Sequence, residues 1–104
     1  MKILAIEHEL SNGTHDEFQL FSRAEALRVW ELHQQGIIRE MYFRADRNEA
    51  VLILECDDTE AARETLETLP FVAKKLIAFD LIPLKAYPGF ARLFAPTANH
   101  KQGN

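Results

Sequence analysis

Three glutamates occur on segments whose alternating residue pattern predicts neighbouring β-strands: Glu7, Glu40 and Glu55. A carboxylate in a partly apolar cavity resists ionisation, so its pKa rises and it can take up or release a proton near neutral pH. We expect these three side chains to converge in one pocket and to provide the base of a proton-transfer reaction. For each glutamate singly, the alternative is a position at the sheet rim, in solvent or in an ordinary ion pair.

Three further residues are candidates for substrate binding: Arg39, Tyr42 and His8. A guanidinium binds a carboxylate through two parallel hydrogen bonds, and a phenol can donate to an oxyanion. Arg39 would instead pair with a neighbouring glutamate if the site were only structural, and Tyr42 would be a core aromatic. His8 is expected at the end of the first strand, where a core or rim position is the more ordinary role.

Other kinds of site find no support in the residue spacing. The single Cys56 excludes an internal disulfide and a cysteine-based zinc site. The four histidines lack the spacing of a helical or strand metal site, and the four glycines are isolated rather than grouped in a phosphate-binding loop. We therefore expect neither a metal nor a cofactor.

Composition indicates one globular domain. The chain has 104 residues, of which 47% are hydrophobic and 27% charged, with a formal net charge of −4. Lysine and arginine are spread along the chain, which argues against a nucleic-acid surface, and no apolar run approaches the roughly 20 residues of a membrane span. We expect a cytoplasmic protein with one domain over residues 1–94 and a flexible tail over 95–104.

The expected strands cover residues 2–9, 37–44, 50–56 and 75–87, because branched and apolar residues alternate or run together there. A helix is expected over 22–35, beginning at a capping box of Ser22 and Glu25 and ending at Gly36. A second helix is expected over 58–68, with Asp57 as a capping residue and Pro70 ending it.

This βαββαβ order predicts the α+β ferredoxin-like fold, a four-stranded antiparallel sheet with two helices on one face. The residues expected to face the helices are Leu4, Ile6, Met41, Phe43, Leu52 and Leu54. The opposite face would carry the glutamates together with Ile3, Ala5, Ile38, Tyr42, Val51 and Ile53. Such an apolar face favours a homodimer packed sheet against sheet, with Phe90, Leu93 and Phe94 reaching across to the partner.

Three short motifs resemble those of muconolactone isomerases. Their Gly-x-x-Arg-x-x-aromatic stretch is similar to Gly36-Ile37-Ile38-Arg39-Glu40-Met41-Tyr42. The end of their second helix is similar to Thr65-Leu66-Glu67-Thr68-Leu69-Pro70-Phe71, and the end of their last strand is similar to Tyr87-Pro88. The resemblance implies the dimeric α+β-barrel superfamily. Glu40 and Phe43 stand where these isomerases have histidine and arginine, which puts the muconolactone substrate itself in doubt.

The resemblance and the acidic residues together predict a muconolactone isomerase-like enzyme. It would transfer a proton without a cofactor on a small lactone, enol or aromatic carboxylate. Two alternatives remain open at this point: a cofactor-free monooxygenase of the same superfamily, and a non-catalytic ligand-binding or stress-related dimer. An aromatic pocket without a carboxylate–arginine pair would favour the monooxygenase, whereas glutamates in solvent would favour the non-catalytic dimer.

Overall fold

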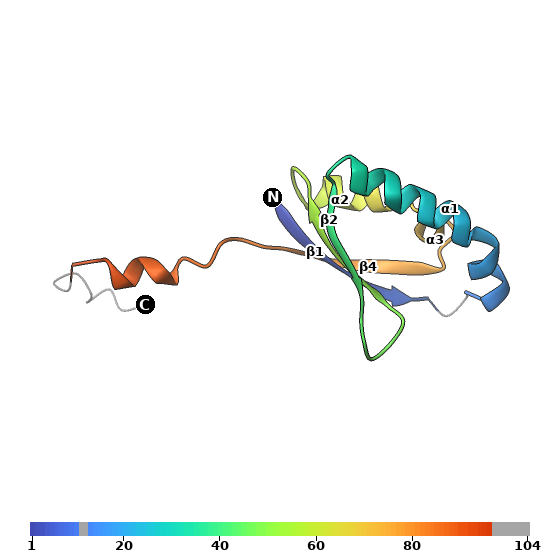
Figure 1. Cartoon of the computed structure of the whole chain (residues 1–104), viewed down its shortest axis with the longest axis horizontal. Coiled ribbons are helices and arrows are strands. Elements are labelled where there is room, and N and C mark those ends of the chain that lie inside the picture. Colours follow the sequence, from blue (N-terminus) through green and yellow to red (C-terminus); the bar gives the residue numbers. More distant parts are fainter. Residues whose placement is uncertain (11–12, 97–104) are drawn as a thin grey trace.

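The computed structural model describes residues 1–10 and 13–96. Four antiparallel strands form one sheet in the order β2-β3-β1-β4, and the helices cover one of its faces (Figure 1). The strands are β1 (Lys2–Glu9), β2 (Ile38–Phe43), β3 (Ala50–Glu55) and β4 (Ile77–Pro83), and the helices are α1 (His15–Gln34), α2 (Thr59–Leu66) and the short α3 (Pro70–Ala73). The predicted ferredoxin-like order is confirmed. No helix in this part of the chain is long and apolar enough to cross a membrane.

Helix α1 begins well before the position that the sequence predicted. The Thr14 hydroxyl accepts a hydrogen bond from the Glu17 amide at 3.2 Å, and the Glu17 carboxylate accepts one from the Thr14 amide at 3.3 Å. This is a complete capping box. Ser22, predicted to be the N-cap, lies inside the helix and donates its hydroxyl to the Gln19 carbonyl. That prediction was wrong because a second Thr-x-x-Glu pattern lies upstream.

The other helix ends follow local chemistry closely. Gly36 has φ of +80°, the left-handed conformation that favours glycine after a helix, so the predicted end of α1 is confirmed. The N-cap of α2 is Asp58 rather than Asp57, and its carboxylate accepts from the Ala61 amide at 2.7 Å. Pro70 follows α2 as predicted, but it also opens α3, because proline is well suited to the first turn of a helix.

The two faces of β1 are the reverse of the prediction. Ile3 and Ala5 are completely buried and lie opposite Leu54 and Leu52, so they face the helices. Leu4 and Ile6 are therefore on the other face. Both sets of alternate residues in β1 are apolar, which is why the sequence pattern did not distinguish them.

A register shift in β2 explains a second error. Ile38 pairs with Leu54, Glu40 pairs with Ile53, and the ladder is irregular between them. An extra residue reverses which face the following side chains occupy. Ile38 lies before the shift and is buried in the core, although it was predicted for the open face. Glu40 and Tyr42 follow the shift and lie on the open face, as predicted. The helix-facing prediction holds for Leu52 and Leu54, the buried core residues of β3.

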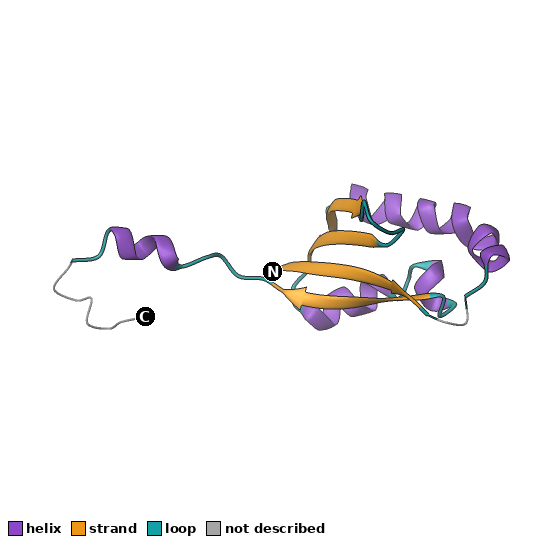
Figure 2. Ribbon diagram, turned by 90° about the horizontal axis from the view of Figure 1, so that it is seen from below, coloured by secondary structure: helices purple, strands orange, loops and turns teal. Residues whose placement is uncertain are grey.

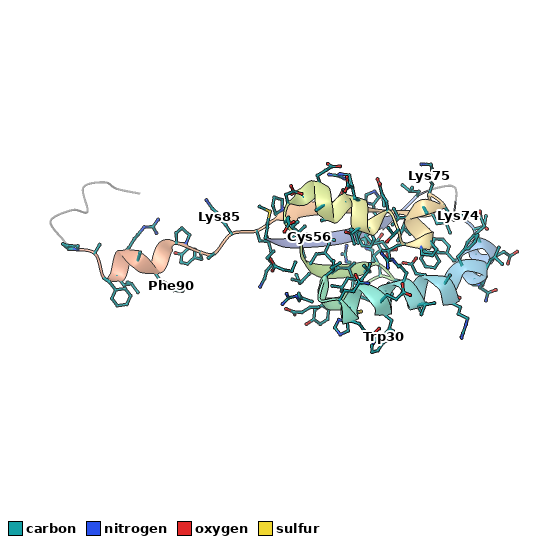
Figure 3. All side chains as sticks on the ribbon, turned by 90° about the horizontal axis from the view of Figure 1, so that it is seen from above. Trp30, Cys56, Lys74, Lys75, Lys85 and Phe90 are labelled. Atoms are coloured by element: carbon teal, nitrogen blue, oxygen red, sulfur yellow. The ribbon has the colours of Figure 1, made fainter. Side chains whose placement is uncertain are left out.

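Figure 2 shows the arrangement of the strands and helices, and the core lies between these two layers. Its largest fully buried side chains are Ile3, Leu32, Ile38, Leu54, Leu69 and Leu76. Trp30 has 55% of its surface exposed and projects from the outer side of α1 (Figure 3). The helical spacing of Trp30 with Leu27 therefore marks a solvent-facing stripe.

Residues 84–94, which we call the C-terminal arm, leave the sheet and extend away from the helices and strands (Figure 1). The radius of gyration is 18.3 Å, compared with about 13 Å for a compact chain of this length. The arm contains the 3-10 helix η1 (Gly89–Leu93). Its exposed large apolar side chains are Leu84, Tyr87, Phe90, Leu93 and Phe94. The predicted domain boundary at residue 94 stays a prediction, and residues 97–104 of the predicted tail lie outside the described part.

Candidate functional site

A cavity of about 720 Å³ lies between the first half of α1, the helix-facing side of the sheet, and α3. Four phenylalanines contribute to its walls: Phe18, Phe43, Phe71 and Phe79. Phe18 and Phe71 pack edge to face, with ring centroids 5.1 Å apart. A cavity of this size with mostly apolar walls is typical of a small-molecule site.

Glu7 brings a carboxyl group to this cavity from β1. The residue is only 8% exposed, and its Oε1 accepts a hydrogen bond from the Ala50 amide at 2.8 Å. Burial raises the pKa of Glu7, and repulsion from Glu49 and Glu9 raises it further, whereas the Ala50 hydrogen bond acts in the opposite direction. Burial therefore makes Glu7 a weaker acid than an exposed glutamate, which suits a group that takes up and releases a proton.

Glu25 brings a second carboxyl group, from α1 on the other side of the cavity. Its Oε1 accepts a hydrogen bond from the Phe71 amide at 2.9 Å. Burial raises the pKa of Glu25, the Phe71 hydrogen bond partly offsets this, and the charge of Glu7 raises it again. Ionised Glu7 thus makes ionisation of Glu25 less favourable.

The other two predicted catalytic residues lie outside this cavity. Glu40 is exposed on the open face of the sheet and accepts a hydrogen bond from the Tyr42 hydroxyl at 2.8 Å. Glu55 pairs with the N-terminal amine at 2.7 Å, which lowers its pKa. The expected convergence of Glu7, Glu40 and Glu55 is therefore wrong, because β1 presents Glu7 to the helix side of the sheet.

The predicted substrate-binding residues also lie apart from the cavity. Arg39 is exposed and donates from Nε to the Gly36 carbonyl at 2.5 Å, where it stabilises the turn after α1. His8 is exposed at the end of β1, with its Nδ1 3.6 Å from an Asp80 carboxylate oxygen. Tyr42 has 59% of its surface exposed. The structure does not bring these three residues together with Glu7.

Glu25 was missed because the sequence pattern offered a simpler role for it. It was assigned to the capping box of Ser22, although the real capping box lies at Thr14. A different signal was present: Phe18, Glu25, Val29 and Leu32 recur at spacings of seven, four and three, which places them on one face of a helix. A glutamate on the buried side of a helix is uncommon unless it has a partner or a function.

The remaining polar groups at the cavity include Glu9, His15, Ser22 and Asn48. Among the described residues that line it, none is lysine or arginine. In residues 1–10 and 13–96, no group of three or more histidine, cysteine or acidic side chains is arranged to hold a metal ion. The chemistry available from these side chains is therefore proton transfer and hydrogen bonding.

Comparison with known proteins shows the fold. No protein-family model matches the sequence, and no curated protein matches it. The structure is similar to that of muconolactone isomerase, with a TM-score of 0.68 and 15% sequence identity over 85% of this chain and 92% of the other. It is also similar to 5-chloro-2-hydroxyhydroquinone dehydrochlorinase (TftG) from Burkholderia phenoliruptrix AC1100 in complex with 2,5-dihydroxybenzoquinone, with a TM-score of 0.59 and 16% identity over 86% and 98%. The chain therefore shares its fold, the ferredoxin-like α+β arrangement, with these two proteins.

Proposed function

We propose that this protein catalyses a cofactor-independent proton transfer on a small cyclic substrate bound in the cavity. The observation that carries the proposal is the pair of carboxyl groups, Glu7 and Glu25, in one cavity with aromatic walls. Each has a raised pKa through burial, and each is held by a backbone amide. Glu40 and Glu55, the other glutamates predicted from the sequence, have no part in this mechanism.

The two carboxyl groups have complementary tasks. The ionised member removes a proton from the carbon next to a substrate carbonyl, and the electron pair of that C–H bond moves into an enolate. The protonated member donates a hydrogen bond to the developing oxyanion. The proton then returns to another carbon of the conjugated system, so that substrate and product are isomers and no oxidant or reductant is needed.

The structural neighbours support this type of reaction. One is named as an isomerase of a lactone, and the other as a dehydrochlorinase of a chlorinated hydroxyhydroquinone. Both names describe small cyclic substrates, which would fit a cavity of about 720 Å³. At such low sequence identity they support the type of site rather than the identity of the substrate.

A cofactor-free monooxygenase is the second candidate, and one observation favours it. The cavity has four phenylalanines in its walls and no arginine among the described lining residues. Such a pocket could bind an electron-rich ring that itself reduces oxygen. A non-catalytic dimer is less well supported, because Glu7 is buried at the cavity rather than exposed to solvent.

Deuterium exchange separates these functions. We would incubate the full chain in D2O with cyclic ketones, enols and lactones, with and without oxygen, and follow deuterium incorporation by NMR together with oxygen consumption. Proton transfer predicts exchange that is independent of oxygen and is lost in Glu7→Gln and Glu25→Gln. The exposed Glu64→Gln on α2 is the matched control. Oxygen uptake without exchange would favour the monooxygenase.

We also propose that the protein is a homodimer. The open face of the sheet carries Leu4, Ile6, Val51 and Ile53, with the exposed Ile82 of β4 beside them. The C-terminal arm adds five exposed large apolar side chains and extends away from the sheet. A second copy would cover both surfaces. A cytoplasmic location stays a prediction.

A further inference from the structure

We propose that the cavity binds an uncharged ring that carries hydroxyl or carbonyl oxygens, and that it excludes substrates bearing a carboxylate. This inference rests on the proposed function, since it specifies the substrate of the same site. It replaces the expectation that Arg39 would bind a substrate carboxylate. Arg39 lies at the turn after α1, where its Nε donates to the Gly36 carbonyl.

The fixed charges at the cavity are negative. Glu7, Glu9 and Glu25 contribute to its walls, and Glu49 lies close enough to raise the pKa of Glu7. Among the described lining residues, His15 at the start of α1 is the one side chain that can become cationic, and it is exposed. A bound carboxylate would therefore face several like charges without a buried cation to balance it.

Two cationic side chains that are next in sequence to lining residues, Arg44 and Arg28, have acidic partners. Arg44 pairs with Asp46 at 2.7 Å and with Glu49 at 3.6 Å, on the β2–β3 hairpin. Arg28 pairs with Glu31 at 3.1 Å and donates to the Thr68 hydroxyl at 2.9 Å. Removing a carboxylate from water without a cation costs several kcal/mol, so these arrangements disfavour an anionic substrate.

An uncharged oxygenated ring matches the groups that are present. The protonated carboxyl of the pair can donate to a substrate carbonyl, and the ionised one can accept from a substrate hydroxyl. The edge-to-face pair of Phe18 and Phe71 contributes aromatic surface against which a ring can pack. A cationic ligand would require both carboxyl groups to be ionised, and burial works against their ionisation.

Three probes of similar shape test the inference by binding alone. They are methyl para-hydroxybenzoate, which is uncharged, para-hydroxybenzoate, which is anionic, and tyramine, which is cationic. We would titrate each into the full chain at pH 7.5 by NMR, using the amide signals of Ala50 and Phe71 to report binding in the cavity. The expected result is that the ester binds at least about tenfold more tightly than either charged probe.

A charge added at the mouth of the cavity provides a second test. Gln19 is exposed and lines the cavity, so Gln19→Lys should fold and should improve binding of para-hydroxybenzoate several-fold. Glu64→Gln changes the net charge by the same amount on α2 and should leave binding unchanged. Equal or tighter binding of either charged probe to the wild-type chain, or binding of none of the three, would overturn the inference.

The inference and the proposed function can fail separately. If the ester binds preferentially but no uncharged ring shows deuterium exchange, the proposed proton transfer is wrong and the preference for uncharged rings is supported. If exchange occurs equally fast on carboxylate-bearing rings and on their esters, the proposed proton transfer is supported and the preference for uncharged rings is wrong.

Discussion

The Glu25 carboxylate accepts a hydrogen bond from the Phe71 amide at 2.9 Å, and this contact joins α1 to the first turn of α3 at the cavity. Alanine at position 25 would remove the acceptor and leave a half-buried amide without its partner, which costs about 1–3 kcal/mol. We expect Glu25→Ala to lower the free energy of unfolding by that amount in urea titration. Glu25→Gln keeps an oxygen acceptor, so its free energy of unfolding should fall much less. An equal decrease in the two variants would contradict this role for the hydrogen bond.

Glu7→Gln should lower the activity without impairing folding. Loss of a general base or acid lowers the rate by about 10²–10⁴-fold, so we expect proton exchange to fall by at least two orders of magnitude. Folding should not suffer, because the glutamine oxygen can still accept from the Ala50 amide.

The pH dependence of stability gives this variant a second readout. The pKa of Glu7 is raised above its ordinary 4.5 in the folded protein, so Glu7 contributes stability that is complete below that value and declines as the pH rises through the folded pKa. The stability of Glu7→Gln relative to the wild type should therefore increase from pH 4 to pH 8 in denaturant titrations. A constant difference across this range would show that the pKa of Glu7 is not raised. Glu64→Gln is the control, since Glu64 is exposed.

The order of elements was predictable because each segment carries a strong local signal. Gly36 ends α1 by its left-handed backbone, and the apolar run in residues 50–56 identifies a strand whichever face is buried. The site was less predictable, because its composition depends on which face of β1 meets the helices. Alternate residues of β1 are equally apolar, and the register shift after Ile38 puts this residue on the face opposite to that of Glu40 and Tyr42. Neither effect can be read from local pattern. Of the three predicted glutamates, only Glu7 lines the cavity, and it does so from the face opposite to the predicted one.

The C-terminal arm should control the oligomeric state. We expect a chain that ends after Lys85 to fold, because this truncation retains β4 and the hydrogen bond from the Leu84 amide to the Lys2 carbonyl. It should nevertheless shift from dimer to monomer in light scattering. Phe90→Asp in the full chain should act in the same direction, since it places a charge on an exposed apolar side chain of the arm (Figure 3). Lys85→Ala is the control, and an unchanged dimer in both arm variants would show that the arm does not hold the copies together.

Tyr42→Phe tests whether the exposed pair on the open face takes part in catalysis. The Tyr42 hydroxyl donates to Glu40 at 2.8 Å, and both side chains are exposed on the side of the sheet away from the cavity. The hydrogen bond raises the pKa of Tyr42, so the phenol stays protonated and neutral at physiological pH. We expect kcat/KM for exchange to change by less than about threefold, because an exposed hydrogen bond contributes little and the reacting atoms lie on the other face. If kcat/KM fell as much as in Glu7→Gln, the catalytic site would instead lie on the open face, where Glu40, Tyr42 and Arg39 were first predicted to act. Measuring both variants on one substrate therefore decides which face of the sheet carries the chemistry.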